Sequence, residues 1–215
     1  MVAAPFLLYV APDLMPETLL VATVGLPLFM LRSEGGDADI KGLRWAIGGR
    51  VPGMLLGVTV LAAAQTRMLG LLVALSVLAS VAVSILMMKR RLAIRRSGFS
   101  LALAGGISGF TGTTVAVGGP PMALVYQDES GGRVRATLAV YFLFGALSSL
   151  VMIAAFGLLD VGAALVGLAC LPIVVASHYA SVRLRTRVDD GVRVGVLAIC
   201  ALAALILLLD SVFGH

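Results

Sequence analysis

Charged residues are scarce in this chain, where Asp, Glu, Lys and Arg together make up only 13% of 215 residues. Soluble domains carry about 25%. Hydrophobic residues account for 60% of the chain, and its mean hydropathy is +1.07. This composition excludes a soluble globular domain, and several apolar stretches are long enough to cross the roughly 30 Å core of a bilayer. We therefore predict an all-α polytopic membrane protein.

Cysteine and histidine are also rare, with two of each in the chain. Cys170 and Cys200 lie in apolar stretches without a CxxC or Cys/His pattern, which predicts small buried side chains. We expect no metal site and no cofactor. The net charge of +5 does not indicate nucleic-acid binding. The basic residues instead gather at the ends of apolar stretches, where they act as topology signals.

Six stretches are predicted to cross the membrane completely, at residues 16–32, 44–64, 68–88, 135–157, 162–182 and 192–213. None carries an Asp or Glu near its middle, which argues against ion coupling through a carboxylate. Two further apolar pieces remain, a short one at 2–11 and a broken one at 99–127.

The stretch at 99–127 cannot form one continuous helix, because it contains several glycines and the pair Pro120-Pro121. Unpaired backbone is too costly to expose to lipid, so a broken segment at membrane depth should line a protein cavity. In secondary transporters, such a break near the midplane is the usual binding device. The sequence therefore indicates a transporter.

The two halves of the chain are weakly similar. Pro52 follows Pro5 by 47 positions, and Pro172 follows Pro121 by 51. We predict two inverted repeats, each with three full transmembrane helices and a broken Gly/Pro-rich re-entrant hairpin. The predicted parts are a first membrane repeat at 1–88, a basic cytoplasmic linker at 89–98 and a second membrane repeat at 99–215.

Charge favours the re-entrant form of the segment at 99–127. If this segment crossed the membrane fully, 9 of the 16 basic residues would be cytoplasmic. If it turns back, 15 are cytoplasmic and only Arg67 lies outside. The positive-inside rule prefers the second arrangement. Only four residues precede Pro5. We thus expect the first hairpin to lack its entering half-helix. Either the start of the chain is assigned too late, which we favour, or the protein is naturally shortened.

The candidate substrate site lies at the break. Glycine allows close approach to the main chain, proline suits a first helical turn, and freed N–H groups there attract anions. The alternative is that the glycines only permit close helix packing and the threonines bond their own backbone. The candidates are Thr111, Gly112, Thr113, Thr114, Gly118, Gly119, Pro120 and Pro121, with Ala4 and Pro5 from the first half.

Arg50 is the one basic residue that lies well inside a predicted crossing. It either attracts an anion or reaches with its charged end to the headgroups, and the sequence leaves both open. Two rival functions also stay open. A passive anion channel could have the same fold, and Gly106-Ile107-Ser108-Gly109 could mark an intramembrane serine protease with His178 as its base.

The run from Gly105 to Tyr126, with its GGPP core, precedes a helix start that reads RATLAVYF from Arg135. With Gly49-Arg50-Val51-Pro52-Gly53 in the first half, these motifs resemble the sulfite exporter TauE/SafE family of bacterial inner-membrane anion permeases. The resemblance implies outward movement of sulfite, sulfoacetate or related sulfonates. It also implies that Gly112 and the run 118–121 form the second glycine motif, and that residues 3–5 end the first.

The expected function is therefore export of small sulfur-containing anions by alternating access, as two repeats rock around a midplane site, and not an enzymatic reaction. The expected partners are the anion and the lipid bilayer, with a homodimer left open and no nucleic acid. The expected location is the bacterial inner membrane, with the main basic loops in the cytoplasm. The substrate, direction, coupling ion and oligomeric state are not readable from the sequence.

Overall fold

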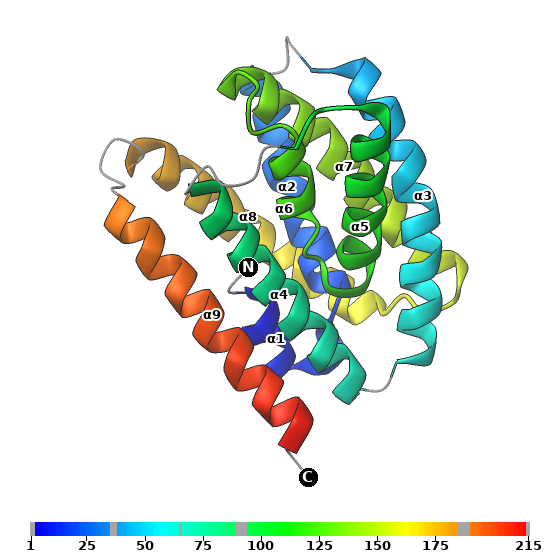
Figure 1. Ribbon diagram of the computed structural model, residues 1–215. Helices are drawn as coiled ribbons and strands as arrows, with labels where there is room; N and C mark the ends of the chain where they lie inside the picture. The colour runs from blue at the N-terminus through cyan, green and yellow to red at the C-terminus, as the bar shows by residue number, and fades with distance from the viewer. Residues whose placement is uncertain (1–2, 35–37, 65, 89–93, 185–189, 214–215) are drawn as a thin grey trace.

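The computed structural model describes residues 3–34, 38–64, 66–88, 94–184 and 190–213, and within them all regular structure is helical (Figure 1). In chain order the elements are α1 (Ala3–Val10), the short 3₁₀ turn η1 (Pro12–Leu14), α2 (Glu17–Glu34), α3 (Ile40–Ala63), α4 (Thr66–Met88), α5 (Gly98–Val115), α6 (Gly119–Val125), α7 (Gly131–Ala155), α8 (Val161–Leu184) and α9 (Asp190–Phe213).

Each predicted crossing is found as a helix, and the predicted break at 99–127 separates α5 from α6. By length and composition, four helical stretches of the described chain could cross a membrane: Ile40–Ala63, Arg67–Met88, Gly131–Ala155 and Val194–Ser211. The prediction of an all-α polytopic membrane protein is confirmed. Full crossing by α2 and α8, and the division into two inverted repeats, stay predictions.

Helices α3 and α5 lie side by side (Figure 1). A methyl group built on Gly49 would overlap the carbonyl oxygen of Ala102, and one on Gly53 would overlap that of Gly106. The same holds for Gly105 against the carbonyl of Ala46. Glycine is required at these positions because the two backbones come too close for any Cβ atom.

Two other groupings complete the bundle. Helix α2 packs between α7 and α8, while α4 and α9 run side by side with the short α1 against both (Figure 1). The apolar cluster between α1, α4 and α9 includes Ala4, Val77 and Cys200, and it extends to Val115 and Val117 at the break between α5 and α6. The tip of this broken helix is therefore held inside the protein, away from lipid.

Candidate anion site at the broken helix

The chain reverses direction between α5 and α6. Ala116 ends α5 in the left-handed conformation, with φ of 56°. Two prolines in the first turn of α6 then fix the start of the next helix. The hydroxyl of Ser108, in the middle of α5, donates a hydrogen bond to the carbonyl of Gly118. This bond holds the start of α6 against α5, so that the two form a hairpin.

Helix α3 places Arg50 beside this reversal. Its side chain is only 3% exposed. One terminal guanidinium nitrogen lies 3.4 Å from the hydroxyl oxygen of Ser108. The guanidinium carbon lies 4.9 Å from the centre of the Tyr141 ring, a distance at which the ring face attracts a cation. A methyl group on Gly112 would be 3.1 Å from the other terminal nitrogen, so the glycine makes room for the arginine.

Among the described residues, the charge of Arg50 has no counterion. No carboxylate of that part of the chain forms an ion pair with it, and its Nε has no hydrogen-bond partner. A buried cation without a counterion is strongly unfavourable, because burial removes its hydration. This imbalance makes Arg50 a candidate for holding an anion.

A pocket of about 200 Å³ opens next to the guanidinium. Its lining comes from five helices and the loop between α5 and α6: Leu20, Thr23, Leu26 and Pro27 from α2, Arg50 from α3, Gly112 from α5, Ala116 and Gly118 from the reversal, Gly119 from α6, and Phe142 and Ala146 from α7. The volume exceeds that of several water molecules, which take about 30 Å³ each, so a small anion fits.

The pocket brings together four of the residues predicted from the sequence, namely Arg50, Gly112, Gly118 and Gly119. It does not include the three predicted threonines of α5. The Thr111 hydroxyl donates to the carbonyl of Ile107 and that of Thr114 to the carbonyl of Phe110, while the Thr113 hydroxyl shares a hydrogen bond with Ser149. These are contacts within the helix or the core, as in the packing alternative.

Three further predicted residues, Pro120, Pro121 and Ala4, are not among the residues that line the pocket. Pro120 is buried and Pro121 half-buried in the first turn of α6. Ala4 packs in the cluster that contains Val115 and Val117 beside the break. Pro5 belongs to α1, but its side chain lies outside the described part of the structure.

The sequence reasoning missed the wall that α2 and α7 contribute. Leu20, Leu26, Phe142 and Ala146 are ordinary apolar helix residues, and only the fold shows that they face Arg50. The one local signal was Pro27, which lies inside α2 and weakens that helix beside the pocket.

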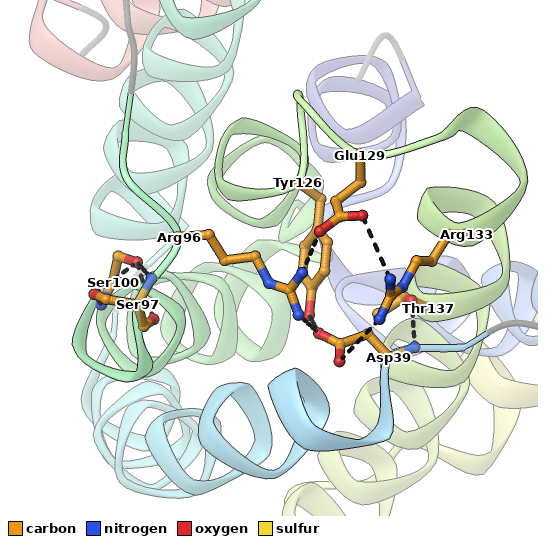
Figure 2. Close-up of polar contacts among 8 residues, drawn as sticks. All are labelled: Asp39, Arg96, Ser97, Ser100, Tyr126, Glu129, Arg133 and Thr137. Carbon is orange, nitrogen blue, oxygen red and sulfur yellow. Dashed lines mark hydrogen bonds and ion pairs between the residues drawn. The ribbon is translucent and has the colours of Figure 1, made fainter.

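A second polar site ties the two ends of the hairpin together (Figure 2). Arg96, just before α5, forms ion pairs with Asp39 and with Glu129, which follows α6. Arg133 lies 3.7 Å from each of the same two carboxylates. The residues from 96 to 129 therefore start and finish at the same end of the bundle, as the predicted re-entrant geometry requires.

Asp39 is the centre of this ionic network. Its carboxylate is 4% exposed and accepts a hydrogen bond of 3.0 Å from the Tyr126 hydroxyl, and its backbone N–H donates to the Thr137 hydroxyl. Burial alone would raise the pKa of Asp39. The Gly42 amide, the Tyr126 hydroxyl and the nearby Arg96 and Arg133 outweigh burial and hold the pKa below its ordinary value.

An apolar cluster separates the network from Arg50. Tyr126 belongs to both the network and this cluster, and Tyr141, under the Arg50 guanidinium, closes its other side. Met122 belongs to the same cluster, and all three side chains are fully buried. Apolar packing therefore connects the ionic network to the arginine.

Membrane-length apolar helices, a helix broken within the protein and a buried arginine with no ion-pair partner among the described residues fit the class of membrane carriers for small anions. The comparison with known families identifies the group. The family described as Sulfite exporter TauE/SafE matches residues 1–207 of 215. The chain belongs to this family and is a multi-pass membrane transporter of anions. A search of curated proteins and a search of solved structures gave no match.

Family membership bears on the rival predictions. TauE/SafE proteins are transporters and not enzymes. The Ser108 side chain is completely buried, and its hydroxyl already donates to Gly118. His178, its predicted base, has a side chain outside the described part of the structure. Neither the structure nor the family match supports a homodimer.

Proposed function

We propose that this chain exports small sulfur-containing anions, sulfite or organosulfonates, by alternating access around the Arg50 pocket. The observation that carries the proposal is the buried guanidinium of Arg50, whose Nε has no partner, beside a pocket at a broken helix. Membership of the sulfite exporter family supports the same substrate class.

The chemistry of binding follows from the lining. An anion that enters the pocket loses water and gains the charge of Arg50, which neutralises the otherwise unfavourable buried cation. Gly118 and Gly119 present main chain without side chains, and a methyl group on Gly119 would meet only the Phe142 ring, at 3.9 Å. Because Arg50 is the only charged residue among the described residues of the lining, the anion is held by one charge and can leave again.

Topology sets the direction. We place the end of the bundle that carries Arg96 and Arg133 in the cytoplasm, since this puts 15 of the 16 basic residues on that side of a bacterial inner membrane. A membrane potential that is negative inside then drives anions outward without a coupling ion.

The test is labelled-sulfite flux in proteoliposomes with an imposed membrane potential. We expect flux from the native chain and its loss in Arg50→Gln, because the neutral side chain no longer compensates the anion. Arg44→Gln is the matched control, since Arg44 is an exposed residue of the same helix. Gly119→Leu should also stop flux by filling the pocket, while membrane insertion is retained.

Equal flux in the native chain and in Arg50→Gln would show that the anion binds elsewhere. Flux that rises in proportion to anion concentration, without saturation, would instead favour the passive channel.

A further inference from the structure

The guanidinium of Arg50 lies directly against Gly145, a buried residue inside α7. A methyl group built on Gly145 would be 2.4 Å from the guanidinium carbon, 2.4 Å from one terminal nitrogen and 2.8 Å from Nε. Non-bonded carbon atoms rest about 3.5–4.0 Å apart, so any side chain here would push the guanidinium away by roughly 1 Å or more. Arg50 keeps its place because position 145 has no side chain.

Gly145 differs in this respect from the glycines between α3 and α5. A methyl group on Gly49, Gly53 or Gly105 would meet the backbone of the neighbouring helix first. The three atoms nearest to one on Gly145 all belong to the Arg50 side chain. Glycine inside a helix costs about 1 kcal/mol relative to alanine. The missing side chain of Gly145 therefore makes room for the arginine and not for a neighbouring backbone.

Three further residues contact the same guanidinium. Tyr141 lies one helical turn before Gly145, so its ring and the bare Cα are on the same face of α7. From α5, Ser108 contributes its hydroxyl to one terminal nitrogen, and Gly112 leaves space beside the other. We call these four residues the arginine seat: Ser108, Gly112, Tyr141 and Gly145.

The arginine seat holds the charge without cancelling it. All four of its residues are neutral, and the Nε of Arg50 keeps no hydrogen-bond partner. Hydrogen bonds weaken steeply with distance and angle, so a shift of roughly 1 Å is enough to break those to a bound anion. The position of the guanidinium is therefore as important for binding as its charge.

We propose that Gly145 is a positioning residue for anion binding, because its bare Cα lets the guanidinium of Arg50 lie against α7 at the pocket. Gly145 is not among the residues that line the pocket, and its effect passes through the arginine. This inference rests on the proposed function, since it takes Arg50 as the group that holds the anion.

The test is Gly145→Ala in labelled-sulfite flux. We expect the half-saturating sulfite concentration to rise about tenfold, as for a lost hydrogen bond to a charged group, while maximal flux stays near the native value. Thermal unfolding without anion should also stay near native, because the displaced atoms end a flexible side chain. Gly132→Ala is the matched control, since a methyl group there, in the same helix, meets nothing within 4 Å.

A double substitution shows whether the effect passes through Arg50. Arg50→Lys keeps the positive charge but lacks the planar fork of the guanidinium. In this background Gly145→Ala should cost little further affinity, whereas independent sites would add. Thermal stabilisation by sulfite compares the native chain, the two single variants and the double variant. If Arg50→Lys binds no sulfite, the comparison of Gly145→Ala with Gly132→Ala decides alone.

The outcomes separate the two proposals. An equal loss of affinity from Gly145→Ala in both backgrounds, or a loss of stability with native affinity, would overturn the positioning role. If Arg50→Gln stops flux but Gly145→Ala binds and transports sulfite like the native chain, this inference is wrong and the proposed function stands. If Arg50→Gln transports like the native chain, or the native chain transports no sulfite, both fail.

Discussion

At the scale of single residues, Arg50 combines two properties that normally exclude each other. It is buried, yet nothing in the described protein neutralises it. The Tyr141 ring below the guanidinium offsets part of the burial cost, and such contacts contribute about 2 kcal/mol when water is absent. Under the proposed function, Tyr141 is expected to be a positioning residue that holds the Arg50 guanidinium for the anion.

This role predicts a contrast between two substitutions of Tyr141. Tyr141→Leu removes the ring face and should weaken anion affinity roughly tenfold. Tyr141→Phe keeps the ring and loses only a hydrogen bond of 3.3 Å to the carbonyl of Gly105, so its affinity should stay near the native value. Anion titration by thermal stabilisation measures both, and equal losses in the two variants would contradict a role for the ring.

Sequence reasoning at this scale named Arg50, the glycines and the threonines as candidate ligand residues, and the pocket brings Arg50 and three of the glycines together, whereas the threonine hydroxyls form hydrogen bonds elsewhere. Threonine in a helix commonly donates to the carbonyl one turn earlier, and Thr111 and Thr114 do so here. This preference is local, so it could be predicted from the sequence. That apolar residues of α2 line the same pocket as Arg50 could not be predicted, because it depends on tertiary packing.

At the scale of elements, the pairing of α3 with α5 depends on glycines at the contact. Gly48 and Gly49 are adjacent in α3 but differ in surroundings. A methyl group on Gly48 would meet nothing within 4 Å, whereas one on Gly49 would overlap the backbone of Ala102. The neighbouring positions thus provide a matched pair.

We expect Gly49→Ala to lower the free energy of unfolding by about 1–3 kcal/mol, because it overpacks the contact between α3 and α5. Gly48→Ala should be neutral or raise stability by up to about 1 kcal/mol, since alanine favours the helix. Unfolding of the purified protein in detergent micelles compares them, and similar effects at both positions would refute the close contact.

The positions of the helices were readable from the sequence, because apolar stretches of membrane length are separated by charged or Gly/Pro-rich connectors. Their pairing was not. The contact of α3 with α5 joins segments on opposite sides of the linker at 89–98, and hydropathy carries no information about such partners.

At the scale of the whole molecule, the ionic network joins four segments at one end of the bundle (Figure 2). Its buried member is Asp39, whose pKa is held below the ordinary value. A carboxylate with a lowered pKa stabilises the fold above its unfolded pKa of about 4, and this contribution is lost as pH falls through the folded pKa.

We expect Arg96→Gln to lower the free energy of unfolding at neutral pH by about 1–3 kcal/mol. The buried Asp39 then keeps the more distant Arg133, at 3.7 Å, as its ion-pair partner. The difference from the native protein should disappear at acid pH, where Asp39 is protonated in both. Arg95→Gln is the control, since Arg95 is the exposed neighbour. A difference that persists unchanged in acid would contradict a charge-based role.

The backbone contact between α3 and α5 also bears on which parts would move in the proposed alternating access. Because these helices meet through glycines and Ser108 ties α6 to α5, we expect α3, α5 and α6 to move together and to carry Arg50 and Gly118. Helix α2 packs on α7 and α8, so we expect these three to form the opposing group. Each group would take helices from both halves of the sequence. Arg133, at the start of α7, bridges the two groups through its ion pairs with Asp39 and Glu129.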